Sequence, residues 1–234
     1  MIEIDTPDGV RAVFSTREGG VSTGAYSSLN LGPSTDDTPA AVTENWRILA
    51  EGMGLRHDAL VANRQVHGRD VRVVDDPAGP AVDGDGLVTN RRHVGLLALG
   101  ADCLPVLIWR MDGSAVGAAH VGWRGVLAGV IGATAQALGG GPLGAAIGPG
   151  IGPCCYPVGD DIRTAFLDDF GPGVVDGRVI AVARAAEIAL ERAGVDRANL
   201  QVIDRCTACE PDHFFSYRRD GAPSGRQAGL VWRT

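Results

Sequence analysis

The alternation of apolar and polar residues along the chain predicts many short strands and a smaller number of helices. Apolar, β-branched runs bounded by glycine, proline or aspartate are typical of strands, whereas apolar residues three and four positions apart are typical of helices. We expect helices over residues 38–52, 126–138, 158–170 and 179–193. We expect strands over residues 2–4, 10–14, 60–66, 71–74, 87–89, 94–99, 104–110, 115–121, 145–147, 200–203 and 227–232.

The stretch from Ala101 to Gly125 predicts a hairpin that brings a cysteine beside a histidine. Two apolar runs flank Asp112-Gly113, which is a strong signal for a two-residue turn. Counting back from this turn along both strands sets Pro105 opposite His120. Cys103 then lies just beyond Pro105, at the same end of the hairpin.

Several of the predicted strands form adjacent hairpins instead of alternating strictly with helices. This order favours an α+β fold with mixed β-sheets over a doubly wound sheet. The chain has 234 residues, of which 45% are hydrophobic, and it is long enough for one substantial core. No repeat, low-complexity tract or linker interrupts the sequence, so we expect a single domain over residues 1–234.

The charge balance restricts the partners and the chemistry. A net charge of −7 argues against a nucleic-acid polymer as the partner, so a small molecule is expected. All 21 basic residues are arginines, which excludes lysine Schiff bases, pyridoxal phosphate anchoring and the P-loop lysine. The start of the chain does not resemble a signal peptide and no apolar run approaches transmembrane length. We expect a cytoplasmic monomer or weak homodimer without a membrane partner.

Three residues form a candidate metal site. His67, Cys103 and His120 are ligands of the kind that zinc prefers, and three protein ligands with an open fourth position are typical of catalytic zinc. A rival interpretation makes Cys103 a nucleophile and His120 its base, with no metal. A third possibility is that the histidines are hydrogen-bonded strand-end residues and the cysteine a small buried thiol.

The remaining cysteines lie in two pairs. Cys206 and Cys209, followed by His213, resemble half of a structural zinc site or a redox dithiol. A structural site normally needs a second pair of ligands, and no thioredoxin-like context surrounds this pair. We therefore expect these two cysteines, and the adjacent Cys154-Cys155, to be packed thiols that are dispensable for chemistry.

Several arginines lie in turns rich in glycine, serine or aromatic residues. Their planar guanidinium groups suit phosphate or carboxylate, and only one or two of them should contact substrate. The same turns carry Phe214, Phe215 and Tyr217, which could stack on a planar base or seal the core. The arginines in question are Arg17, Arg64, Arg124, Arg218, Arg219 and Arg226.

Taken together, these segments resemble one known family over nearly the whole chain. It is the family of multicopper polyphenol oxidases or laccase-domain proteins, also described as purine nucleoside phosphorylases and as peptidoglycan editing factors. The matching motifs are STREGGVS (15–22), NRQVHG (63–68), DGDGLVT (83–89), ADCLPVLI (101–108), AAHVGWRG (118–125), IGPCCYPVG (151–159) and FFSYRRDG (214–221), with Gly225-Arg226 following.

The resemblance implies a zinc-dependent enzyme with a β-sandwich-like core flanked by helices, similar to cysteine-deamidase toxins. It implies phosphorolysis of adenosine, inosine, guanosine and methylthioadenosine, with adenosine deamination as a further activity. The family's metal ligands fall on His67, Cys103 and His120. The copper label suits the sequence poorly, because a multicopper centre needs many more than the five histidines present.

These two reactions need different groups. Deamination needs a proton donor for the leaving amine, and Asp102 is our candidate acid or base beside Cys103 and His120, although an aspartate there could equally orient a ligand. Phosphorolysis needs an anion held in line with the sugar's C1′. Arg17 and Arg64 are our first candidates for holding phosphate, followed by Arg226.

Two other function classes stay open. One is a metal-free Cys–His amidohydrolase or peptidoglycan precursor editing enzyme. The other is a binding protein that retains a vestigial site, although an intact set of ligands weighs against it.

Overall fold

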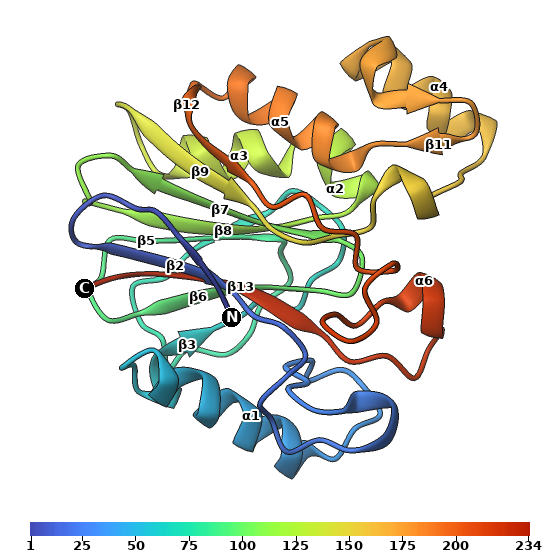
Figure 1. Ribbon diagram of the computed structural model, residues 1–234. Coiled ribbons are helices and arrows are strands. Elements are labelled where there is room, and N and C mark those ends of the chain that lie inside the picture. Colours follow the sequence, from blue (N-terminus) through green and yellow to red (C-terminus); the bar gives the residue numbers. More distant parts are fainter.

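The computed structural model describes all 234 residues, arranged as two stacked β-sheets with helices on both outer faces (Figure 1). One sheet has five strands in the order β1-β2-β13-β6-β3 and the other has six in the order β12-β9-β7-β8-β5-β4. Both sheets mix parallel and antiparallel neighbours, which confirms the α+β fold with mixed sheets.

The strands are short. The five-stranded sheet consists of β1 (Ile2–Ile4), β2 (Val10–Phe14), β13 (Gln227–Arg233), β6 (Gly95–Gly100) and β3 (Leu60–Val61). The six-stranded sheet consists of β12 (Val195–Val202), β9 (Leu143–Ile147), β7 (Leu104–Arg110), β8 (Val116–Val121), β5 (Gly86–Thr89) and β4 (Val71–Val73). A small separate ribbon pairs β10 (Val175–Asp176) with β11 (Val179–Ile180).

The helices cover the outer faces of the two sheets (Figure 1). The five-stranded sheet is covered by α1 (Pro39–Gly52). The six-stranded sheet is covered by α2 (Trp123–Ala128), α3 (Val130–Ala137) and α5 (Val182–Arg192), and α4 (Asp160–Phe170) packs against α2, α5 and the β10–β11 ribbon. A short last helix, α6 (Tyr217–Asp220), lies near the opening of the site described below. No helix is long and apolar enough to span a bilayer.

Strand β7 shows why the central strands are apolar on both faces. Leu104, Val106 and Ile108 point toward the helices, whereas Leu107 and Trp109 point into the core between the two sheets. Full burial of each such side chain stabilises the fold by about 1.5–3 kcal/mol. The continuous apolar run follows from this double burial, because neither face of the strand meets water.

The hairpin between β7 and β8 has the predicted register. Pro105 pairs with His120, so Cys103 and His120 lie at the same end of the hairpin. Residues 101–103 connect β6 of one sheet to β7 of the other. Cys103 and His120 therefore lie at the end of the sandwich where the chain crosses between its sheets.

Four of the predicted elements differ from the structure by three residues or more, and one of them is the strand expected over residues 200–203, which begins at Val195. The helix expected over residues 126–138 begins at Trp123 and is broken at Gly129, whose left-handed backbone (φ 85°) ends α2. The strand expected over residues 60–66 ends at Val61, because the backbone of residues 66–68 turns inward to donate hydrogen bonds to Asp85. The helix expected over residues 179–193 begins at Val182, after Val179 and Ile180 have paired in β11.

Candidate functional site

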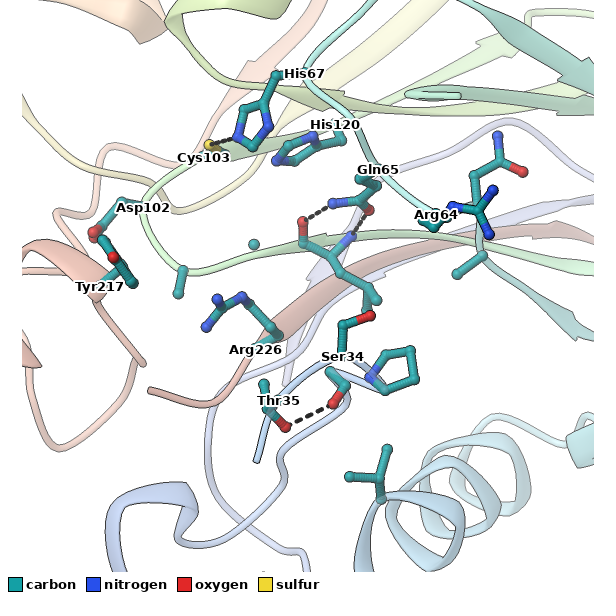
Figure 2. Close-up of a pocket in the computed structure, with 18 of the residues that line it drawn as sticks. Ser34, Thr35, Arg64, Gln65, His67, Asp102, Cys103, His120, Tyr217 and Arg226 are labelled. Atoms are coloured by element: carbon teal, nitrogen blue, oxygen red, sulfur yellow. Dashed lines mark hydrogen bonds between the residues drawn. The ribbon is translucent and has the colours of Figure 1, made fainter. Parts of the chain in front are cut away.

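The ligand atoms of His67, Cys103 and His120 all lie within 4.8 Å of one another. His67 Nε2 is 3.8 Å from Cys103 Sγ, and the two imidazole rings meet edge to face with their centroids 4.9 Å apart. His67 comes from the loop after β3, Cys103 from the crossover between the sheets and His120 from β8 (Figure 2). We call these three residues the His–Cys–His group.

A buried aspartate orients two residues of the His–Cys–His group. Asp85 is 3% exposed and accepts a hydrogen bond from Nδ1 of His120 at 2.8 Å. It also accepts hydrogen bonds from the backbone N–H groups of Val66, His67 and Gly68, at 3.2, 2.9 and 2.7 Å. The contact with Nδ1 leaves Nε2 of His120 available as a ligand atom, an arrangement common among metal-binding histidines.

Sequence reasoning did not identify Asp85. Its only local signal is the motif DGDGLVT, in which an aspartate between two glycines directly precedes an apolar strand. The partners that give this aspartate its role lie 17 to 35 residues away along the chain. No local pattern marks such contacts.

A glycine makes room for the site. A Cβ atom at Gly122 would lie 2.8 Å from Cys103 Sγ and 3.2 Å from the His67 ring. Any side chain at this position would displace a ligand, as expected of the glycine-rich exit from β8. Two borderline and one soft ligand in a fixed arrangement fit a divalent metal that keeps a fourth position open.

The Cys103 thiol and the His120 imidazole strongly affect each other's ionisation. Burial opposes ionisation of Cys103, but the charge of His120 and hydrogen bonds from both histidines outweigh it and lower the pKa of Cys103 to about 6. Burial likewise opposes a charged His120, but the Cys103 thiolate and the hydrogen bond to Asp85 raise the pKa of His120 to about 9. A thiolate therefore forms at neutral pH, which is the state that binds metals and also the state that attacks electrophiles.

The His–Cys–His group opens into a cavity of about 980 Å³, the volume of a site for a nucleotide-sized molecule (Figure 2). Polar and charged side chains line much of its wall, together with four aromatic residues. Gln65 is fixed there by two hydrogen bonds to the backbone of Leu99. The aromatic lining residues are Trp46, Trp123, Tyr156 and Tyr217.

The arginines that the sequence suggested for substrate binding lie in different parts of the structure. Arg226 and Arg64 line the cavity, as do Arg124 and Arg218. Arg226 donates to the backbone oxygens of Ser224 and Gly225 and pairs with no carboxylate. Burial lowers its pKa, against the attraction of nearby Cys103 and Asp102, yet a guanidinium stays charged, so Arg226 offers the cavity a positive charge that is in no direct ion pair. Arg64 instead pairs with Asp83 on the surface.

Arg17 lies outside the cavity, in a separate shallow hollow. Its guanidinium donates to the backbone oxygens of Ser27 and Pro211, at 2.7 and 2.8 Å, and stacks over Phe215. Phe215 and Phe214 are fully buried, so they seal the core and cannot stack on a ligand.

Asp102 faces the C-terminal loops. Its Oδ1 atom accepts hydrogen bonds from the hydroxyl groups of Thr207 and Ser216, both at 2.7 Å, and its Oδ2 atom accepts one from the backbone N–H of Arg218 at 2.6 Å. The backbone of Asp102 has a positive φ of 94°. Its carboxylate thus holds two loops against the crossover that carries Cys103.

A comparison with known protein families identifies the group to which the chain belongs. The model of the family described as multi-copper polyphenol oxidoreductase laccase matches residues 11–234. The chain belongs to this family.

Family members of similar length align over almost the whole chain. A Pseudomonas aeruginosa protein named as a purine nucleoside phosphorylase is 40% identical, covering 97% of this chain and 94% of its own. The Escherichia coli purine nucleoside phosphorylase YfiH is 37% identical, covering 97% of this chain and 95% of its own. A solved Neisseria meningitidis structure has a TM-score of 0.92 at 36% identity, covering 99% of this chain and 98% of that one. A second solved structure, YlmD from Geobacillus stearothermophilus, has a TM-score of 0.88 at 33% identity, covering 96% and 92%.

Proposed function

We propose that the chain is a zinc-dependent purine nucleoside phosphorylase that acts on adenosine, inosine, guanosine and methylthioadenosine, with adenosine deamination as a side activity. The observation that carries the proposal is the His–Cys–His group at the wall of a nucleotide-sized cavity that also contains an unpaired arginine. The names of the relatives support the same activity. All five cysteines are free thiols, which supports a reducing compartment such as the cytoplasm.

Zinc suits the histidine content of the chain better than a multicopper centre does. The chain has five histidines, and only His67 and His120 are part of the His–Cys–His group. A set of two imidazoles and one thiolate with an open position is typical of catalytic zinc, whereas a multicopper centre needs many more histidines. A bound zinc would act as a Lewis acid and stabilise negative charge that develops on the substrate in the transition state.

The residues around the metal position have separable tasks. Asp85 keeps a proton on Nδ1 of His120 and holds the loop of His67 in place. Arg226 binds phosphate, because its charge has no carboxylate partner and its guanidinium faces the cavity (Figure 2). Tyr217 and Trp123 offer apolar faces on which a purine can stack.

Asp102 has two candidate roles, but its carboxylate contacts the C-terminal loops and none of the three residues that the sequence alternative had it orient. The three donors that fix its carboxylate support a positioning role, in which Asp102 places the backbone of Arg218 and the start of α6 at the edge of the cavity. Proton transfer to the leaving group is the alternative. Asp102→Asn separates the two, since loss of proton transfer changes the pH profile of kcat, whereas loss of positioning raises KM at every pH.

The test uses the purified chain. We expect release of hypoxanthine from inosine that requires phosphate, is abolished by a chelator and returns when zinc is added. Conversion of adenosine to inosine without phosphate would measure the deaminase activity separately. A zinc-loaded protein that releases no base in the presence of phosphate would overturn the proposed function.

One observation favours a second candidate, the metal-free Cys–His amidohydrolase or peptidoglycan precursor editing enzyme. The Cys103 thiolate lies beside the His120 imidazolium, and the Asp85 carboxylate orients that imidazolium from its other side. This is the arrangement of a nucleophilic triad. Such an enzyme would keep its amidase activity after chelation and lose it on alkylation of Cys103. A zinc enzyme would lose its activity in both treatments.

A further inference from the structure

The four cysteines outside the His–Cys–His group form a single cluster, contrary to the expectation of two separate packed pairs. Their Sγ atoms all lie within 4.8 Å of one another. Cys209 Sγ is 3.6 Å from Cys154 Sγ and 3.4 Å from Cys155 Sγ, and none of the four is in a disulfide. The pair Cys206 and Cys209 therefore does have a second pair of ligands, namely Cys154-Cys155. We call these four residues the four-cysteine cluster.

The backbone brings the two pairs together. Gly150 and Cys206 form an isolated parallel bridge, in which the N–H of Thr207 donates to the oxygen of Gly150 at 3.0 Å. Cys154 and Cys155 end the short helical turn Pro153–Cys155, which comes shortly after Gly150 in the chain. Cys206 and Cys209 lie in the loop after β12. The cluster is thus built from two segments more than fifty residues apart, each held by main-chain contacts that do not depend on the thiols.

Gly152 completes the arrangement. Its backbone N–H donates to Cys206 Sγ at 3.2 Å, a contact that stabilises a thiolate ligand. A Cβ atom at this position would lie 3.2 Å from Cys154 Sγ and 3.3 Å from Cys206 Cβ. The absence of a side chain here lets the loop of Cys154 come close to Cys206.

We propose that Cys154, Cys155, Cys206 and Cys209 bind a second zinc ion, which has a structural role. Zinc–sulfur bonds of about 2.3 Å in a tetrahedron place sulfur atoms roughly 3.8 Å apart, close to the separations in the cluster. Four thiolates fill the coordination of zinc and leave no position for substrate. The site is closed, unlike the His–Cys–His group.

The second zinc would brace one wall of the cavity. It joins the loop of Tyr156, which follows Cys155 directly, to the loop of Thr207, whose hydroxyl donates to Asp102. Tyr156 lines the cavity and carries Arg218 stacked over its ring, 4.8 Å from the centroid. Loss of this zinc should loosen residues 150–157 and 203–213 without changing the His–Cys–His group.

The experiment counts zinc ions per chain by native mass spectrometry of protein purified under reducing conditions with zinc. We expect one zinc to be lost in Cys206→Ser/Cys209→Ser and equally in Cys154→Ser/Cys155→Ser. The matched control is Cys103→Ala, which disrupts the His–Cys–His group and must keep the zinc of the cluster. The cluster is therefore tested even if the first site binds no zinc or the proposed phosphorylase activity is absent.

A second measurement needs no variant of the cluster, in case the double variants do not fold. Cobalt added to metal-free Cys103→Ala should produce the intense thiolate-to-cobalt charge-transfer absorption of a four-sulfur site. Hydrogen exchange in residues 150–157 and 203–213 should then be slower with metal than without it. The proposal would be overturned if both double variants kept the full zinc count. It would also be overturned if the mass of a freshly reduced, metal-supplied chain showed disulfides in place of metal.

Discussion

Both groups could hold a metal, but the His–Cys–His group offers two imidazole nitrogens and one thiol, the four-cysteine cluster offers four thiols, and different parts of the fold hold them. The first has ligands at strand ends, fixed by the buried Asp85, and it opens into the large cavity. The second has ligands in two loops, held by one main-chain bridge and the N–H of Gly152, and its four thiols surround one point. If both proposals hold, an open coordination position beside a cavity, rather than the presence of soft ligands, distinguishes the site for chemistry from the site for stability.

The largest expected effect is that of Cys103→Ala, which tests whether the first site depends on its metal. The substitution removes one of three ligands, so most of the zinc of the His–Cys–His group should be lost. Turnover should fall by about 10³-fold or more, because a metal stabilises the transition state by several kcal/mol. Elemental analysis and phosphorolysis assays measure both quantities. Full zinc occupancy in this variant would remove Cys103 from the ligands and favour its role as a nucleophile.

Arg226→Ala tests whether the cavity holds phosphate. The sequence pointed first to Arg17 and Arg64, but Arg17 lies outside the cavity and Arg64 pairs with Asp83, so our proposal moves to Arg226. Removing this cation should lower phosphorolysis by roughly 10²-fold, as for the loss of one preorganised donor. Deamination consumes no phosphate and should suffer less. Arg17→Ala is the matched control, and an equal and selective fall in that variant would place the anion site elsewhere.

Asp85→Asn tests the orientation of the ligands. An asparagine can still accept from His120, but its amide NH₂ would then face the N–H groups of Val66 and Gly68, which would lose their acceptor. Loss of an outer partner of this kind typically costs 10-fold to 100-fold in metal affinity or activity. Competition with a zinc chelator measures the affinity. The control is Asp83→Asn, two residues away on the surface, which should bind zinc as the unmodified chain does.

Most strands and helices of the fold were predictable from local signals in the sequence. The turn at Asp112-Gly113 fixed the register of its hairpin, and with it the pairing of Pro105 with His120. Asp85 and the four-cysteine cluster were missed because their contacts join segments far apart in the chain. Cys154-Cys155 lacks the spacing of a usual zinc-binding pair, and only the bridge between Gly150 and Cys206 shows that it faces the second pair.

Cys206→Ser/Cys209→Ser should affect stability more than turnover, in contrast to Cys103→Ala. A structural metal contributes several kcal/mol or more to folding, and each kcal/mol changes Tm by about 2–4 °C in a chain of this size. We therefore expect Tm to fall by on the order of 10 °C, with turnover of the folded protein reduced far less than in Cys103→Ala. Calorimetry and assays at a temperature where the variant is folded measure the two effects. A variant with unchanged Tm but no turnover would indicate that the four-cysteine cluster serves catalysis and not stability.

The smallest effect concerns the pH dependence of the metal-free protein. The folded pKa of Cys103, about 6, is below its ordinary value of 9.0, so its contribution to stability is present above pH 9 and is lost as pH falls through 6. The folded pKa of His120, about 9, is above its ordinary value of 6.5, so its contribution is present below pH 6.5 and is lost as pH rises through 9. One contribution grows as the other declines, so the free energy of unfolding should change little between pH 6.5 and 9.

Reactivity should respond to pH where stability does not. Alkylation of Cys103 in chelated protein, followed by peptide mass spectrometry, should rise with a midpoint near pH 6, because only the thiolate reacts. The thiols of the four-cysteine cluster lack a histidine partner and provide an internal comparison in the same sample. A midpoint for Cys103 near that of an ordinary thiol would show that His120 does not stabilise the thiolate. The ligand and nucleophile interpretations of Cys103 both depend on a thiolate at neutral pH, and both would then lose that support.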